Sequence, residues 1–153
     1  MLDAGDVKVL RLIQENCRLT AREISDRTGL PVTTVFAKIK RIERLGLVRG
    51  YRAVLNAREL GAGTTAFVLA SFAYKNKARV SQRKVAKEIA GFPEVQEVHI
   101  ISGEWDMLIK VKAQDVDAVG KYVVEKLRLV KGIERTLTCL VFESEKESTA
   151  IVL

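Results

Sequence analysis

The sequence of 153 residues predicts an α+β chain with two domains, an N-terminal winged helix-turn-helix joined to a C-terminal ferredoxin-like βαββαβ domain. Apolar residues recur with the period of an α-helix up to about residue 50. From residue 64 onward, strand-like runs alternate with amphipathic helices. We therefore assign residues 1–50 to the helix-turn-helix, residues 51–63 to a wing and linker, and residues 64–153 to the βαββαβ domain.

The first domain contains clear helix boundaries. Asp3 is placed to cap a first helix. Thr20 and Glu23 have the spacing of a capping box, in which each side chain accepts a hydrogen bond from the backbone N–H of the other. The helix that starts there should end near Gly29, because glycine tolerates the left-handed conformation of a helix end. Pro31 suits the start of a third helix, because its missing N–H would be unpaired there.

The third helix combines an apolar stripe with a basic face. The expected buried stripe is Val35, Ile39, Ile42 and Leu45. Small side chains near the start of the opposite face let a helix approach base edges in the major groove, and basic side chains further along reach phosphates. This face carries Thr34, Ala37, Lys38, Arg41 and Arg44. The segment LVRGYRAVL that follows resembles a small wing.

Positive charge is concentrated around this third helix. The chain has a net charge of +7, and residues 1–52 contain 11 Lys or Arg against 6 Asp or Glu. Residues 31–52 alone contain six basic residues and a single acid, Glu43. This distribution favours a polyanion-binding surface. The alternative is a basic helix face that only meets solvent, or a three-helix unit without a DNA function.

The second domain follows the order βαββαβ. The predicted strands are 65–74, 95–101, 106–113 and 134–143, and the predicted helices are 80–92 and 116–130. Interleaving the two strand-helix-strand halves gives a four-stranded antiparallel sheet with both helices on one face. Both faces of the first strand are largely apolar, whereas helices cover only one face of the sheet. We therefore expect the other face to pack against a second copy of the chain, giving at least a dimer.

The cysteines, the lengths of the apolar runs and the N-terminal segment argue against a disulfide-rich, metal-binding, membrane or secreted protein. Cys17 and Cys139 lie far apart within apolar patterns, which predicts buried thiols and no metal site or disulfide framework. No apolar run approaches the roughly 18 residues of a membrane span, and the N-terminus lacks the pattern of a signal peptide. We expect a cytoplasmic protein without a membrane partner.

The loop SGEWD, residues 102–106, joins two strands and holds the only tryptophan of the chain. The backbone N–H groups near Gly103 are approachable and can bind a carboxylate, whereas Asp106 can pair with an ammonium group. An amino-acid zwitterion offers both groups, and Trp105 can supply a wall. The alternative is a plain hairpin turn in which Trp105 packs and both acids, Glu104 and Asp106, face water.

The order and spacing of several segments resemble the Lrp/AsnC (leucine-responsive, feast/famine) family of transcription regulators. The segments are LDAGDVKVLRLIQENCR, LTAREISDRTGL, TTVFAKIKRIERLGLVRGY, FPEVQEVHIISGEWDMLIKV and LVKGIERTLTCLVF. The resemblance implies an N-terminal helix-turn-helix that binds double-stranded DNA and a C-terminal effector-binding RAM domain. It also implies homodimers that assemble further, into tetramers to octamers. Pro31 departs from the family pattern, in which a serine usually caps the recognition helix.

The resemblance also implies site residues. The expected DNA contacts are Arg22, Thr33, Thr34, Ala37, Lys38, Lys40, Arg41, Arg44 and Arg49. Effector binding is expected at a G-x-x-D-like motif and at two threonines of the last strand, namely Gly103, Glu104, Trp105, Asp106, Thr136 and Thr138. The expected effector is glutamine or another small amino acid, and no other cofactor is implied.

Three other functions compete with this interpretation. An acylphosphatase-like enzyme shares the βαββαβ plan, but His99 has no evident nucleophile beside it and no phosphate loop or catalytic motif is present. An RNA-recognition module would need a K/R-G-F-type motif with displayed aromatics, which the strands lack. An effector-independent architectural DNA-binding protein shares every N-terminal feature, so only ligand titration separates it from an amino-acid-responsive regulator.

Overall fold

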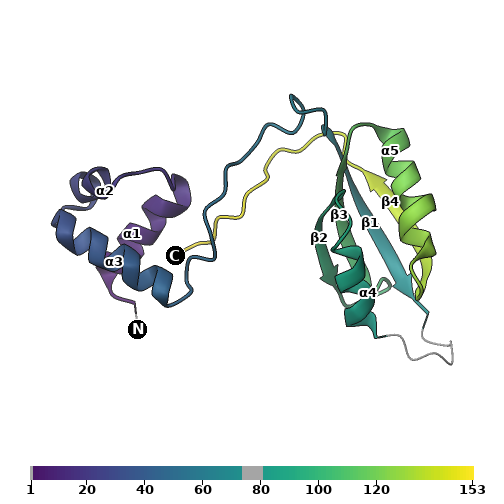
Figure 1. The fold of residues 1–153 in the computed structure, drawn as a ribbon, viewed down its shortest axis with the longest axis horizontal. Helices are drawn as coiled ribbons and strands as arrows, with labels where there is room; N and C mark the ends of the chain where they lie inside the picture. Colours follow the sequence, from purple (N-terminus) through teal and green to yellow (C-terminus); the bar gives the residue numbers. More distant parts are fainter. Residues whose placement is uncertain (1, 74–80) are drawn as a thin grey trace. The chain divides into compact units, whose positions relative to one another are not determined.

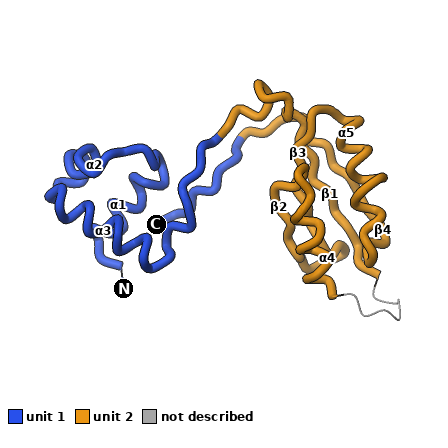
Figure 2. Tube along the Cα trace, viewed as in Figure 1, with its two compact units in different colours: residues 1–54, 146–153 blue, residues 55–145 orange. Residues whose placement is uncertain are grey.

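The computed structural model describes residues 2–73 and 81–153, and the chain forms two compact units. Residues 1–54 together with 146–153 form one unit, and residues 55–145 form the other (Figure 2). The C-terminal residues 146–153 therefore belong with the first unit, whereas the sequence assigns them to the second domain. Within the described residues, no helix is both long and apolar enough to span a membrane.

Short turns join the helices of the first unit (Figure 1). These helices are α1 (Ala4–Glu15), α2 (Ala21–Thr28) and α3 (Val32–Arg44). Asp3 caps α1, since its Oδ1 accepts the N–H of Asp6 at 2.9 Å. The predicted capping box of α2 is confirmed: the Glu23 N–H donates to Thr20 Oγ1 at 3.2 Å, and the Thr20 N–H donates to the Glu23 carboxylate at 2.7 Å. Pro31 precedes α3 without a side-chain cap, as its sequence position predicts.

Apolar side chains from α1, α2 and α3 meet in one small core. Its buried members are Val9, Leu10, Ile24, Val35 and Ile42. The predicted stripe of α3 is confirmed for Val35 and Ile42, and Ile39 packs against the same core. Leu45 is 55% exposed, because α3 ends at Arg44 and the chain turns away at Gly46.

The segment after α3 lacks the strands of the predicted wing. Residues 47–56 form neither helix nor strand. The Tyr51 hydroxyl donates to Glu43 Oε1 at 2.9 Å, which attaches the segment to the end of α3. Burial, followed by the hydrogen bond to Glu43, raises the pKa of Tyr51 to about 12. The phenol therefore stays protonated and acts as a donor at neutral pH.

The tail 146–153 packs along α1 without forming regular structure. The Gln14 side chain donates to the Ile151 carbonyl at 2.7 Å and accepts the Ile151 N–H at 2.9 Å. Arg11 Nε donates to the Leu153 carbonyl at 3.1 Å, and the Leu153 side chain packs against the core of the unit. The tail is thus an integral part of the helical unit.

The second unit contains one four-stranded sheet with the order β2-β3-β1-β4 (Figure 1). In chain order its main elements are β1 (Thr64–Phe72), α4 (Gln82–Ile89), β2 (Val95–Ile100), β3 (Met107–Ala113), α5 (Val116–Lys121) and β4 (Ile133–Leu140). All neighbouring strands are antiparallel, so the predicted ferredoxin-like plan is confirmed. The predicted helix over 116–130 continues beyond α5 as a π-helical turn, Tyr122–Lys126, and a 3-10 turn, Leu127–Leu129. Tyr74 of the first predicted strand and Val80 of the first predicted helix lie outside the described residues.

The two faces of the sheet have different surroundings. On one face, Val68 of β1 and Ile109 of β3 are paired and fully buried against the side chains of α4 and α5, among them Val85 and Val119. Cross-strand partners point to the same side of a sheet, so the opposite face is defined by the alternate pairs. We call it the open face. It carries Phe67, Leu69, Leu108, Leu137 and Cys139.

The expected burial of the two cysteines is wrong for this chain. Both thiols are free and exposed. Cys17 lies beyond the end of α1 at Glu15, so the helical period no longer points it at the core. Cys139 pairs with Phe67 across β1 and β4 and therefore lies on the open face.

Candidate nucleic-acid interface and ligand site

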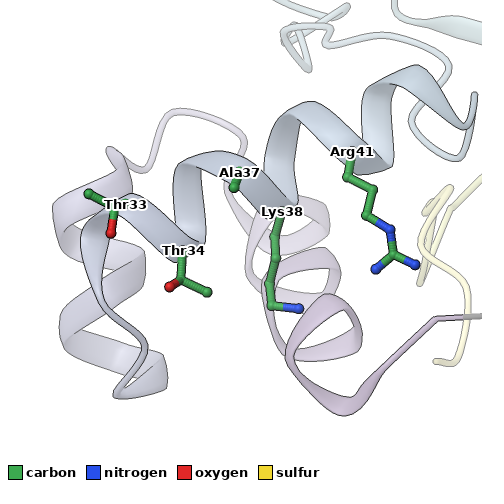
Figure 3. A pocket seen from close by; sticks show the side chains of 5 residues that line it. All are labelled: Thr33, Thr34, Ala37, Lys38 and Arg41. Atoms are coloured by element: carbon green, nitrogen blue, oxygen red, sulfur yellow. The ribbon is translucent and has the colours of Figure 1, made fainter.

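A shallow hollow runs along the outer side of α3. Figure 3 shows the side chains that line it. They are Thr33, Thr34, Ala37, Lys38 and Arg41, all predicted as DNA contacts. Thr33 and Ala37 are exposed, and Thr34 is half-buried. Short side chains at the first turns of α3 leave its backbone approachable, as entry into a major groove requires.

Several of the predicted cations are exposed and unpaired. Within the described ranges, no carboxylate lies within 4.0 Å of the charged groups of Arg22, Lys40, Arg44 or Arg49, which are exposed. Lys40 Nζ lies 4.6 Å from the centre of the Phe36 ring, and Phe36 is itself 53% exposed. The charges of these four side chains are thus available to a polyanion.

Lys38 and Arg41 are different, because two acids of the first helix bind them. Lys38 Nζ lies 2.7 Å from each carboxylate oxygen of Asp3 and 3.1 Å from Asp6 Oδ1. A guanidinium nitrogen of Arg41 lies 2.6 Å from Asp6 Oδ2. The Asp6 side chain is completely buried, and that of Lys38 is only 15% exposed. We call Asp3, Asp6, Lys38 and Arg41 the α1–α3 ion cluster.

The pKa values reflect this cluster. The hydrogen bond from Lys38 is the main reason why the pKa of Asp3 falls from 3.8 to about 2. Burial of Asp6 opposes its ionisation, but hydrogen bonds from the Asp3 backbone and from Lys38 outweigh burial and lower its pKa. The hydrogen bond to Asp3 raises the pKa of Lys38. The two acidic partners, Asp3 and Asp6, are not among the site residues predicted from the sequence. The only signal in the sequence is their spacing of three, which puts both on one face at the start of α1.

The loop 102–106 connects β2 to β3 and is held at the end of β1. Asp106 Oδ2 accepts the Phe72 N–H at 2.7 Å, and the Asp106 N–H donates to the Ala70 carbonyl at 3.1 Å. Gln82 Nε2 lies 3.4 Å from the other oxygen of Asp106. Gly103 has a φ of 121°, a conformation that favours glycine. The Asp106 carboxylate therefore already has partners inside the protein, which argues against its predicted role as the ammonium partner.

Trp105 pairs with a residue that the sequence does not single out. The guanidinium carbon of Arg135 lies 5.3 Å from the centre of the Trp105 ring, a cation–π distance. Arg135 is exposed on β4, as is Glu104 on the loop, whereas Trp105 is half-buried. The exposed Arg135 cation thus lies over the ring, and the exposed Glu104 is the residue before Trp105 in the loop. In the sequence, the only hint that Arg135 belongs to this site is its position next to Thr136, a predicted site residue.

The two predicted threonines of β4 lie on the other side of that strand. Thr136 and Thr138 pair with Ala70 and Val68, which belong to the buried face. The Thr136 hydroxyl accepts a hydrogen bond from Arg128 Nε at 3.1 Å. Arg135 pairs with Ser71 and lies on the open face. The described chain therefore brings Arg135, rather than Thr136, to the loop.

His99 also lies on the open face, as the partner of Leu108. Its Nε2 is 3.2 Å from the Glu97 carboxylate, and Lys110 Nζ is 3.4 Å from the same group. The hydrogen bond with His99 is the main cause that lowers the pKa of Glu97. His99 is thus part of a polar cluster beside the apolar patch.

Comparisons with known proteins agree with both halves of this description. Residues 2–49 match the model of a winged helix-turn-helix DNA-binding domain, and residues 65–151 match the Lrp/AsnC ligand binding domain. An uncharacterized HTH-type transcriptional regulator of Pyrococcus furiosus is 41% identical over 147 residues, covering 96% of this chain and 97% of that protein. The leucine-responsive regulatory protein of Rhizobium meliloti is 30% identical over 150 residues, with 98% and 95% covered.

Solved structures show the same arrangement. A transcriptional regulator from Neisseria meningitidis, in complex with L-Met, has a TM-score of 0.92 at 30% identity and covers 99% of this chain and 97% of that one. AsnC of Escherichia coli has a TM-score of 0.85 at 20% identity, with 98% of both chains covered, and shares the fold. The chain therefore belongs to the Lrp/AsnC family of transcriptional regulators, with a DNA-binding helix-turn-helix and a ligand-binding domain, and it is not an enzyme.

Proposed function

We propose that the protein binds specific double-stranded DNA sequences and that a small amino acid changes its DNA binding or its oligomeric state. The observation that carries the DNA half is the exposed side of α3, where Lys40 and Arg44 have no acidic partner in the described chain. Exposed cations next to short side chains combine phosphate binding with access to base edges.

The roles of the predicted residues follow from their positions. Thr33, Thr34 and Ala37 line the hollow at the first turns of α3 and are assigned to base edges or flanking phosphates. The phosphate contacts are assigned to Arg22, Lys40, Arg44 and Arg49, and also to Arg41, whose side chain stays 37% exposed although it contacts Asp6. Phosphate contacts position the protein, and base contacts give the sequence preference. Lys38, also predicted as a contact, differs from these residues because two carboxylates bind it.

The DNA half is tested by selecting bound duplexes from a random pool and then measuring the dissociation constant against salt concentration. Arg44→Gln should reduce the slope of log K against log salt by about 0.9, the contribution of one phosphate contact. Lys121→Gln removes an exposed charge from α5 in the other unit and serves as the matched control. An unchanged slope for Arg44→Gln would remove Arg44 from the interface, and failure of the wild type to bind any duplex would overturn the proposal.

The effector half rests on the loop 102–106 and its neighbour Arg135. The exposed Arg135 guanidinium beside the Trp105 ring suits a carboxylate, and the exposed Glu104, next to Trp105 in the sequence, suits an α-ammonium group. Gly103 stays in the proposed site, whereas Asp106 shapes the loop. Thr136 and Thr138 lie on the other side of their own strand, so they are assigned to the loop of a second copy of the chain, as the resemblance implies. The related regulator from Neisseria meningitidis was solved with L-Met, which supports an amino acid as ligand.

Trp105 is the only tryptophan, so its fluorescence reports on this loop. Titration with each of the twenty amino acids should change the emission for one small amino acid, with glutamine as the first candidate. Arg135→Met should abolish that change while leaving the far-ultraviolet circular dichroism unaltered. If no amino acid changes the emission, the heat of mixing or the DNA affinity, the protein is instead an effector-independent architectural DNA-binding protein.

The open face supports assembly into homodimers. Phe67, Leu69, Leu108, Leu137 and Cys139 form an apolar surface there, and Leu137 is 45% exposed in the single chain. A second copy that covers this surface would remove it from water. Light scattering with and without the amino acid tests for dimers and for tetramers to octamers. A regulator that binds DNA and a free amino acid is expected in the cytoplasm.

A further inference from the structure

Lys38 is a cation of the recognition helix α3 whose charged group is bound by acidic residues at the start of α1. Lys38 contributes to the hollow along α3 (Figure 3). Its ammonium group nevertheless contacts both oxygens of Asp3 at 2.7 Å and Asp6 at 3.1 Å. Within the α1–α3 ion cluster the charges of the two carboxylates balance those of Lys38 and Arg41, so the ammonium group is already neutralised. A phosphate would have to displace Asp3 before Lys38 could bind it.

Gly5 provides the space for this arrangement. A Cβ atom at Gly5 would lie 2.8 Å from Lys38 Cε, 3.1 Å from Asp3 Oδ1 and 3.2 Å from Lys38 Nζ, so it would press on both partners of the ion pair. The Lys38 side chain thus crosses the first turn of α1 where a side chain is missing. Glycine is a poorer helix former than alanine, so helix propensity does not explain the glycine at position 5. The Lys38 side chain that crosses this position does explain it.

Asp3 can be neutralised without loss of its structural role. Its Oδ1 caps α1 by accepting the N–H of Asp6, and its side chain is 57% exposed. Asparagine caps helices as well as aspartate does. Asp3→Asn therefore removes the nearer of the two charges that hold Lys38 and keeps the cap, and the remaining carboxylate, Asp6, is shared with Arg41. Asp6 offers no such variant, because it is fully buried and also binds Arg41.

We propose that Asp3 and Gly5, which lie outside the recognition helix, set the DNA affinity of the protein by holding Lys38 in an internal ion pair and away from the phosphate backbone. This inference rests on the proposed DNA-binding function. Because the ion pair occupies Lys38, the wild type should make one phosphate contact fewer than the number of cations on α3 suggests. Its DNA affinity should therefore depend less steeply on salt concentration.

The test uses the full-length protein and a fluorescently labelled duplex from the selection above, with dissociation constants measured against salt concentration. Asp3→Asn should release Lys38, steepen the slope of log K against log salt by about 0.9, and tighten binding about fivefold to tenfold near 0.1 M salt. Gly5→Ala should act in the same direction, because its Cβ displaces the Lys38 side chain. Adding Lys38→Met to Asp3→Asn should return the slope to the wild-type value.

Matched controls separate this mechanism from general charge effects. Asp26→Asn removes one exposed negative charge from α2 of the same unit, and Gly120→Ala adds a methyl group to a helical glycine that has open space around it. Both should leave the slope unchanged. Equal slopes for Asp3→Asn and wild type would overturn the inference while the proposed function stands, as would a shallower slope for Lys38→Met in the wild-type background. If the wild type binds no duplex, both fall.

Discussion

The carboxylate of Asp106 accepts a hydrogen bond from the backbone N–H of Phe72, with 2.7 Å between Oδ2 and the nitrogen. Phe72 ends β1, and Asp106 ends the loop that joins β2 to β3. The bond therefore ties the proposed effector loop to a central strand of the sheet. An acid placed in a short loop for ligand chemistry would not be expected to bind the main chain of a neighbouring strand.

We predict that Asp106 contributes more to stability than to ligand charge recognition. Asp106→Ala leaves the N–H of the buried Phe72 without this acceptor and should lower the free energy of unfolding by about 1–3 kcal/mol. Asp106→Asn keeps an acceptor oxygen and should lose less. Urea unfolding followed by Trp105 fluorescence measures both. If the two variants are equally stable but neither binds the amino acid, Asp106 is a ligand contact after all.

Much of the fold follows from local signals that the structure obeys. The Thr20–Glu23 capping box and Gly29, with its φ of 73°, bound α2 where the sequence places them. The alternation of Ala66, Val68 and Ala70 puts these side chains on the buried face. Such signals depend on residues close together in the sequence, and each has one physical cause.

The parts that sequence reasoning misses depend on residues distant in the sequence. Lys38 reads as a DNA contact until Asp3 and Asp6, more than thirty residues earlier, are placed beside it. Arg135 becomes interesting only when β4 brings it to Trp105. The exposure of Cys17, by contrast, has a local cause: α1 ends two residues earlier, and an apolar pattern does not reveal that helix end.

The capping box of α2 gives a simple test of the helical unit. Thr20→Ala removes the oxygen that accepts the Glu23 N–H and should destabilise the unit by about 0.5–2 kcal/mol. Thr20→Ser keeps the hydroxyl oxygen and should be close to wild type. Circular dichroism at increasing urea concentration measures the difference. Equal losses for both variants would assign the effect to the threonine methyl group instead.

The tail should be as protected as the helix on which it packs. Gln14 binds both the N–H and the carbonyl of Ile151, so Gln14→Ala should speed hydrogen exchange of the Ile151 amide and lower stability by about 1 kcal/mol. Gln14→Glu retains the acceptor for the Ile151 N–H but loses the donor, and it should show an intermediate effect. Exchange at Ile151 that does not respond to Gln14→Ala would show that the core contact of Leu153 holds the tail alone.

The two cysteines report on the proposed dimer. Both thiols are exposed in the single chain, but Cys139 lies on the open face and Cys17 lies in the helical unit. A dimer that buries the open face should slow thiol labelling at Cys139 and leave Cys17 fast. Dilution below the dimer dissociation constant should make both fast. Labelling of Cys17→Ser and Cys139→Ser variants assigns the rates, and two equally fast thiols at high concentration would contradict burial of this face.

Acid should weaken the helical unit through the α1–α3 ion cluster. The pKa of Asp3 is lowered from 3.8 to about 2, mainly by its hydrogen bond with Lys38. Because the folded-state pKa is the lower one, the unfolded chain takes up the proton first as the pH falls. The stabilisation from this group is therefore complete above about pH 4 and is lost as the pH falls toward about 2. Asp6, whose pKa is also lowered, acts in the same direction.

Urea unfolding across this pH range, followed by circular dichroism, should show a smaller loss of stability for Asp3→Asn than for wild type, with Asp26→Asn as the matched control. Identical pH profiles for Asp3→Asn and wild type would mean that the ion pair with Lys38 does not stabilise the unit in solution.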